Sequence, residues 1–298
     1  MNQNKIEFGK VRDFGALLNV TFEYIRKNFK VLFLSNLIIS APAILLTGVF
    51  LGLYESSIFN FSIDTEIQQF GIPFLLSMVF MMLSYLIVMV VTYSHLIAYQ
   101  ESEVGTIITI EDVWKKTKQN FFLILFTGLG YSLIIGIVFA VFVVLGFYLV
   151  SIGNAIFILL VLFGIGLTLY LSINYSFIFI IRIQERLRFT EALSRSKELV
   201  KDFWWFTFGV VFVVGLIQGF MMYALYIPTY IVMFFIAFAG IDFASSGIAR
   251  VLFIITSIIT SLSVLFYMLS TLAISFHYFN LVERKEAPGL LEKVESIK

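Results

Sequence analysis

The two histidines are the first residues of this sequence that could take part in acid–base chemistry or bind a metal. His95 and His277 are each followed six residues later by a glutamate, Glu101 or Glu283. Imidazole and carboxylate groups are common metal ligands and proton carriers. A spacing of six residues, however, does not put two side chains on one face of a helix. We therefore expect interfacial histidines and solvated glutamates, with no catalytic, cofactor-binding or metal site.

Other signatures of reactive sites are missing from the sequence. It contains no cysteine, which excludes disulfides and thiolate ligands. It also lacks a phosphate-binding loop, a His-Glu zinc motif and a Gly-x-Ser-x-Gly turn. We predict that the chain is not an enzyme and needs no cofactor.

The composition is that of a membrane protein. Of the 298 residues, 60% are hydrophobic and only 13% are charged, whereas a soluble domain is about half apolar and about a quarter charged. The N-terminal residues are polar and charged, unlike a secretory signal peptide. The net charge of +1 gives no indication of a nucleic-acid partner. We predict an all-α integral membrane protein, with residues 1–298 as a single membrane domain.

Six apolar segments reach the length of about 20 residues that a transmembrane helix requires. Proline interrupts helical hydrogen bonding, so Pro42 should kink the first span. The fifth apolar run is longer than a span needs, and we expect Pro228 to break it into a span and a short further piece. The six runs cover approximately residues 31–54, 72–98, 121–149, 155–181, 203–239 and 248–279.

The distribution of basic residues predicts the orientation in the membrane. Nineteen of the 20 Lys and Arg residues lie in four segments, residues 1–30, 99–120, 182–202 and 281–298, and the exception is Arg250. The alternate connections contain none. Because Lys and Arg are retained on the cytoplasmic side, both termini should be cytoplasmic, with residues 284–298 as a charged cytoplasmic tail.

Residues 189–203 form the clearest amphipathic segment. Thr190 is the expected N-cap, and the segment leads directly into the apolar run that begins with Phe203 and Trp204. Such a helix should lie along the membrane interface and continue into a span. The residues of its predicted apolar face are Phe189, Ala192, Leu193, Leu199, Val200 and Phe203.

Weaker versions of this segment occur twice earlier, and Leu18, Ile110 and Ala192 occupy matching positions. Each copy precedes two spans. The sequence therefore predicts three repeats, about residues 14–101, 106–185 and 188–283, each an interfacial amphipathic helix plus a two-span hairpin. Two spans per copy give all copies one orientation, related by an axis along the membrane normal.

Residues 191–209 resemble a motif of a bacterial six-span membrane protein superfamily. The matching residues are Ala192-Leu193, Ser196, Leu199-Val200 and Phe203-Trp204. This superfamily includes the membrane domain fused to some glycerophosphodiester phosphodiesterases. The resemblance implies a bacterial cytoplasmic (inner) membrane, but no catalytic activity, because the phosphodiesterase activity belongs to a separate soluble domain that this chain lacks.

Asn36, Asn174 and Gln218 are the candidate polar residues within the spans. Such residues usually connect helices by hydrogen bonds and less often line a transport pathway. No Asp, Glu, Lys or Arg lies near the centre of a predicted span, which argues against ion-coupled transport.

The basic residues around the third amphipathic segment are the candidate interface. We expect a non-enzymatic polytopic protein that binds membrane lipids or protein partners at its cytoplasmic face, with no role for nucleic acid. The alternative is a transporter or lipid-handling channel with a cavity on the repeat axis. The candidate residues are Arg182, Arg186, Arg188, Arg195, Lys197 and Lys201.

Overall fold

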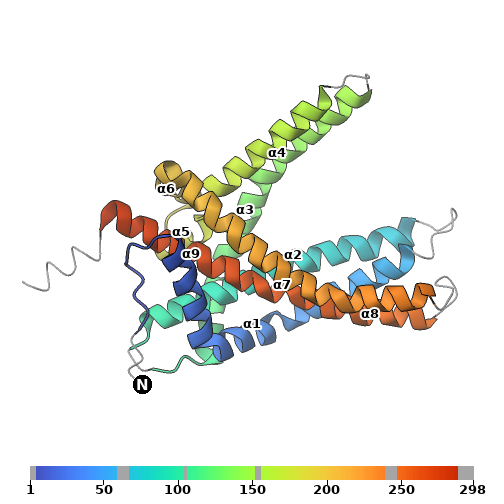
Figure 1. Cartoon of the computed structure of the whole chain (residues 1–298), viewed down its shortest axis with the longest axis horizontal. Coiled ribbons are helices and arrows are strands. Elements are labelled where there is room, and N and C mark those ends of the chain that lie inside the picture. Colours follow the sequence, from blue (N-terminus) through green and yellow to red (C-terminus); the bar gives the residue numbers. More distant parts are fainter. Residues whose placement is uncertain (1–4, 59–66, 104–105, 152–155, 239–246, 288–298) are drawn as a thin grey trace, which may run out of the picture. The chain divides into compact units, whose positions relative to one another are not determined.

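The structure is a computed structural model, and it describes residues 5–58, 67–103, 106–151, 156–238 and 247–287. Every regular element within these ranges is helical (Figure 1). Two short 3-10 segments, Lys201–Phe203 and Leu262–Phe266, join α6 to α7 and α8 to α9. The α-helices are α1 (Phe14–Ile58), α2 (Ile67–Glu101), α3 (Ile110–Ser151), α4 (Phe157–Asn174), α5 (Ile178–Gln184), α6 (Phe189–Val200), α7 (Trp204–Phe238), α8 (Gly247–Ser261) and α9 (Tyr267–Glu286).

Six helical stretches of the described residues are long and apolar enough to cross a membrane. The prediction of an all-α membrane protein with six spans is therefore confirmed. The predicted connection at 55–71 is shorter in the structure, because α1 continues to Ile58 and α2 begins at Ile67, and residues 59–66 lie outside the described residues. Most of the connections predicted at 150–154 and 239–247 and of the tail 284–298 also lies outside them, although α9 continues to Glu286. The six stretches are Phe14–Ser57, Gly71–Glu101, Ile110–Val150, Phe157–Gln184, Phe189–Phe235 and Arg250–Glu286.

The predicted break at Pro228 is wrong, because α7 continues through this residue to Phe238. Proline removes one backbone donor, but a membrane helix tolerates this loss when local adjustment satisfies the freed groups. Pro42 likewise lies inside α1 without ending it. The 35 residues of α7 correspond to about 52 Å of helix, against about 30 Å of hydrocarbon.

The chain forms two compact units. Unit 1 comprises residues 1–23, 119–212 and 273–298, and unit 2 comprises residues 24–118 and 213–272. Both units are assembled from segments far apart in the sequence, and neither coincides with one of the predicted repeats. The three-fold repeat remains a prediction.

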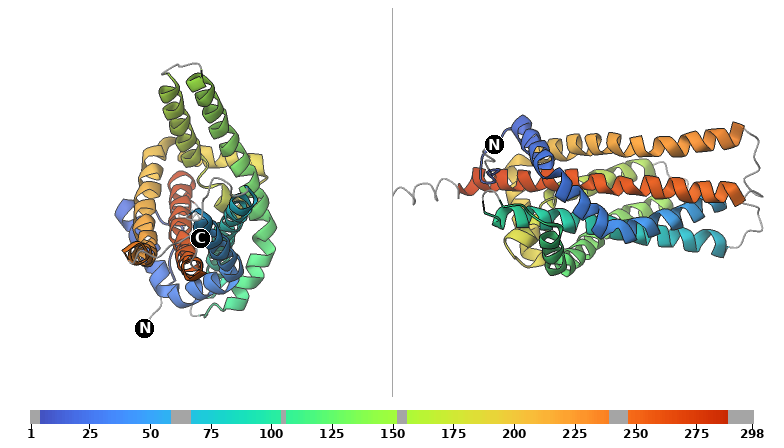
Figure 2. Two further views of the ribbon diagram at one scale, coloured as in Figure 1. Left: turned by 90° about the vertical axis from the view of Figure 1, so that its right-hand side faces the viewer. Right: turned by 90° about the horizontal axis from the view of Figure 1, so that it is seen from below.

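In unit 1, α3 and α4 pack together as a long hairpin (Figures 1 and 2). Gly164 of α4 allows this contact, because a Cβ atom added there would lie 2.4 Å from the Cβ of Phe142 on α3. The chain that precedes α1 packs against α9 of the same unit. The backbone N–H of Arg12 donates to Oδ1 of Asn280 at 2.8 Å, and Phe8 stacks on Phe276 with 5.4 Å between ring centroids.

In unit 2, α1 and α2 are joined by aromatic and hydroxyl contacts. Phe50 and Phe80 stack with 5.5 Å between ring centroids, and Thr47 Oγ1 lies 3.1 Å from Ser84 Oγ. Each hydroxyl also donates to a backbone carbonyl of its own helix. Both buried hydroxyl groups therefore have an acceptor for their hydrogen, which they need in apolar surroundings.

Candidate functional site

The predicted start of α6 differs from the one observed. Helix α6 begins at Phe189, so its N-cap is Arg188, and Thr190 lies inside the first turn. The carboxylate of Glu191 accepts the backbone N–H of Arg188 at 2.9 Å and also pairs with the Arg188 side chain. A glutamate in the first turn accepts a hydrogen bond from a backbone N–H that has no partner within the helix. Its negative charge also interacts favourably with the positive end of the helix dipole.

Arg182 and Arg186, two of the six predicted basic residues, contact α3. Arg182 Nε donates to Thr127 Oγ1 at 3.2 Å, and an Nη of Arg186 donates to Asn120 Oδ1 at 3.2 Å. Arg186 has φ 54°, a left-handed conformation that reverses the chain between α5 and α6. These two side chains therefore hold the α5–α6 connection against α3.

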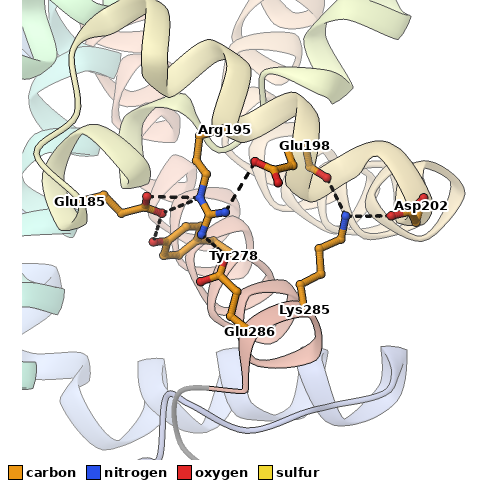
Figure 3. A network of polar contacts seen from close by, with 7 residues as sticks. All are labelled: Glu185, Arg195, Glu198, Asp202, Tyr278, Lys285 and Glu286. Atoms are coloured by element: carbon orange, nitrogen blue, oxygen red, sulfur yellow. Dashed lines mark hydrogen bonds and ion pairs between the residues drawn. The ribbon is translucent and has the colours of Figure 1, made fainter. Parts of the chain in front are cut away.

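Arg195 is the centre of a polar network between α6, the end of α5 and α9 (Figure 3). Its Nε lies 3.2 Å from a carboxylate oxygen of Glu185, and its Nη atoms pair with Glu286 and, at 3.8 Å, with Glu198. The hydroxyl of Tyr278 donates to Glu185 at 2.7 Å. The Arg195 side chain is only 19% exposed, so its charge interacts mainly with these carboxylates and little with solvent.

Lys197 and Lys201 differ from the four arginines. Both are exposed, and no hydrogen bond or ion pair to another described residue involves either ammonium group. They lie four residues apart on one side of α6 and its 3-10 extension, at the edge of a cavity of about 620 Å³. We call this cavity the basic pocket. Its lining residues are Tyr170, Asn174, Lys197, Lys201, Asp202, Phe203, Trp204, Trp205 and Phe206.

Aromatic side chains form a wall of the same pocket. Trp204 stacks on Tyr170 and Phe208 with 5.8 and 5.6 Å between centroids, and it meets Trp205 edge-on at 4.8 Å. The indole Nε1 of Trp204 is buried and has no hydrogen-bond partner among the described residues. A buried tryptophan N–H normally has a partner, so this donor is unsatisfied within the described residues.

Asp202 is the one carboxylate among the residues that line the basic pocket. Its Oδ2 lies 2.9 Å from Nζ of Lys285, which comes from the end of α9. Lys285 also donates to the backbone carbonyl of Glu198 at 2.6 Å (Figure 3). The negative charge of Asp202 is thus balanced by a lysine from outside the pocket.

Comparisons with known proteins do not add to this picture. No family model, curated protein or solved structure matches this chain. The resemblance of residues 191–209 to the six-span superfamily therefore stays a prediction. Function has to be inferred from the geometry of the chain itself.

Asn174, which lines the basic pocket, stands at a helix break that the sequence did not predict. Span four is divided into α4, which ends at Asn174, and α5, which begins at Ile178. Ser196 of α6 bridges the break, because its hydroxyl donates to the Asn174 carbonyl at 2.7 Å and accepts the Phe177 N–H at 3.2 Å. Ser196 is fully buried, so these backbone groups have no access to water.

Ser196→Ala should therefore destabilise the protein, by about 1–3 kcal/mol, because two buried backbone groups lose their partner. Thermal unfolding of the purified protein, followed by tryptophan fluorescence, measures the effect. Ser194→Ala is the matched control, since Ser194 is an exposed serine on the same helix. Equal stability of the two variants would show that the Ser196 hydroxyl does not stabilise the backbone groups at the helix break.

The three predicted intramembrane polar residues have different surroundings. Asn36 on α1 accepts a long hydrogen bond, 3.4 Å, from Thr92 on α2. Gln218 on α7 accepts one from Ser270 on α9. Asn174 is at the end of α4 and lines the basic pocket. The first two therefore connect helices, and the third belongs to the candidate site.

Both histidines are fully buried within the protein. Nδ1 of His95 lies 2.8 Å from the hydroxyl of Tyr24, and Nε2 of His277 lies 2.9 Å from that of Thr207. Glu101 pairs with a lysine of α3. Among the described residues, no three His, Cys, Asp or Glu side chains come together in a way that could hold a metal.

Proposed function

We propose that this chain is a non-enzymatic, multi-pass protein of a bacterial cytoplasmic membrane that binds anionic phospholipid in the basic pocket. The observation that supports this most strongly is the pair of unpartnered ammonium groups, Lys197 and Lys201, beside an aromatic wall. The location of 19 of the 20 basic residues in alternate connections supports a cytoplasmic position for the pocket and for both termini.

The composition of the pocket suits an amphipathic ligand. A phosphate group between Lys197 and Lys201 would be attracted by both ammonium groups, each of which contributes about 1 kcal/mol near an anionic surface. Tryptophan rings are favoured at the membrane interface, where one side is apolar and the other is polar. The Trp204 and Trp205 rings would therefore contact the glycerol and upper acyl region of the same lipid.

The test is the double substitution Lys197→Gln and Lys201→Gln in the full chain, reconstituted in nanodiscs. Loss of two contributions of about 1 kcal/mol each should weaken binding of phosphatidylglycerol by about 30-fold at low salt. Native mass spectrometry or a fluorescent-lipid titration measures this affinity, and added salt should reduce the difference because the interaction is screened.

The matched control is Arg186→Gln with Arg188→Gln, which removes the same charge from neighbouring positions outside the pocket. Arg186 contacts Asn120, and Arg188 pairs with Glu191, so this variant should retain nearly all lipid affinity. Equal losses in the two variants would mean that only general surface charge matters. Full affinity in the lysine variant would exclude the pocket, and capture of a soluble protein partner in place of lipid would favour protein binding.

Within the part of the chain that the structure describes, the observations favour the transporter alternative less. The basic pocket is lined by residues 170–206, which come from the second and third predicted repeats, not from all three around an axis. Asn36 and Gln218, which could have lined a pathway, are hydrogen-bonded between helices. Lipid binding is therefore the function that we favour.

A further inference from the structure

We infer that Lys285, a residue outside the basic pocket, sets the preference of that pocket for phospholipids with net negative charge. The inference rests on the proposed function because it concerns the same pocket. The ligand class is a phosphodiester headgroup without a compensating cation, as opposed to a zwitterionic headgroup. Lys285 acts by neutralising Asp202.

Without Lys285, the charged residues that line the pocket have a net charge of only +1. Lys197 and Lys201 contribute two positive charges, and Asp202 contributes one negative charge. Asp202 follows Lys201 directly in the sequence and feels its charge. An unpaired Asp202 would therefore both attract Lys201 away from a ligand and repel a phosphate group.

Lys285 is held by several contacts in a position where it neutralises Asp202. Its Nζ contacts Oδ2 of Asp202 at 2.9 Å and the Glu198 carbonyl at 2.6 Å, and it lies 5.9 Å from the ring centroid of Phe203. The Lys285 side chain is 21% exposed, whereas that of Asp202 is 64% exposed. The lysine side chain is thus partly buried, although its contact with Asp202 lies at the surface, so added salt should weaken the effect of this pair.

The other carboxylates near this point have their own partner. Glu198 and Glu286 both pair with Arg195, and so does Glu185. None of them needs Lys285, and none lines the basic pocket. The Lys285–Asp202 pair is therefore a contact through which α9 can change the charge that a ligand meets. Arg284 of α9 also lies near the pocket, 5.7 Å from the ring centroid of Phe203, but its charge is the same in all the variants compared below.

A purely structural role for this ion pair makes a different prediction. If the pair only fastens α9 to α6, removing either partner breaks the same contact, and Lys285→Gln and Asp202→Asn should have effects of the same sign. If Lys285 sets the pocket charge, the two substitutions should have opposite effects. Lys285→Gln exposes the Asp202 charge to the ligand, whereas Asp202→Asn removes it.

The experiment compares K285Q, D202N and the double variant with the unchanged chain in nanodiscs, with thermal stability measured for each. We expect K285Q to bind phosphatidylglycerol about three- to tenfold more weakly, with phosphatidylcholine binding unchanged. D202N should bind phosphatidylglycerol more tightly than the unchanged chain, because it leaves the Lys285 charge uncompensated. The double variant, in which both charges are absent, should bind about as tightly as the unchanged chain. This pattern would support the inference.

Equal losses of phosphatidylglycerol binding in K285Q and D202N would overturn it, even if the pocket lysines still prove essential. A lack of any effect from the Lys197 and Lys201 substitutions would instead overturn the proposed function. Inorganic phosphate serves as a further probe of the ligand source. Competition by inorganic phosphate at the concentration at which the lipid binds would show that a free anion is the ligand and would overturn the lipid assignment.

Discussion

Gly52→Ala and Gly48→Ala should each markedly lower the stability of the protein. These glycines lie one helical turn apart on α1, where the backbone of α8 comes very close within unit 2. A Cβ atom at Gly52 would lie 2.5 Å from the Cα of Ile254, and one at Gly48 would lie 2.5 Å from the Cα of Ile258. Because backbone cannot turn aside like a side chain, the helices would have to separate, at a cost of about 1–3 kcal/mol per substitution.

The sign of this effect makes the prediction sharp. In a helix where the added methyl group meets nothing, Gly→Ala should stabilise the protein by about 0.5–1 kcal/mol, since alanine has the higher helix propensity. Gly136 and Gly166 provide that control, because a Cβ at either position has no neighbour within 4 Å. Thermal unfolding in detergent compares the four variants. If G48A and G52A are as stable as G136A and G166A, then α1 and α8 do not approach each other at these glycines.

The number of spans could be predicted from the sequence because it depends on the length and apolarity of each segment, which are properties of the chain read in order. Breaks within spans depend on what lies beside them. The break before Ile178 exists where Ser196, 22 residues beyond Asn174, supplies a donor and an acceptor. Ser196 belongs to the motif that the sequence singled out, but nothing in that motif predicts the role of its hydroxyl.

The cluster of basic residues could be recognised in the sequence. Which of them pair within the protein and which line the basic pocket could not. Arg195 and Lys201 both belong to the amphipathic segment 189–203. Only the fold shows that Arg195 pairs with Glu286, whereas Lys201 lines the basic pocket. The sequence indicated only that Trp204 stands at the start of an apolar run and gave no role to Asp202. Their place in the basic pocket follows from α4 and α9, whose approach to α6 has no local signal.

Arg195→Met should be the most damaging single substitution at the polar network. It removes the cation that pairs with Glu185, Glu198 and Glu286 in the described part of the chain, and methionine keeps much of the side-chain volume. Breaking a buried ion pair costs about 3–5 kcal/mol. Here the side chains of Arg195 and Glu185 are 19% and 25% exposed, so solvent reduces the expected loss to about 2–3 kcal/mol.

Two further variants show whether uncompensated charge causes the loss. Adding Glu185→Gln to R195M should recover part of the stability, because the amide oxygen still accepts the Tyr278 hydroxyl and no longer needs a cation. Arg188→Met is the control, since Arg188 forms an ion pair with Glu191 at the start of α6. The Arg188 side chain is 86% exposed, so this ion pair should contribute little to stability. Thermal unfolding measures all four proteins. Similar midpoints for R195M and R188M, or no recovery with Glu185→Gln, would show that the network does not hold α9 to α6.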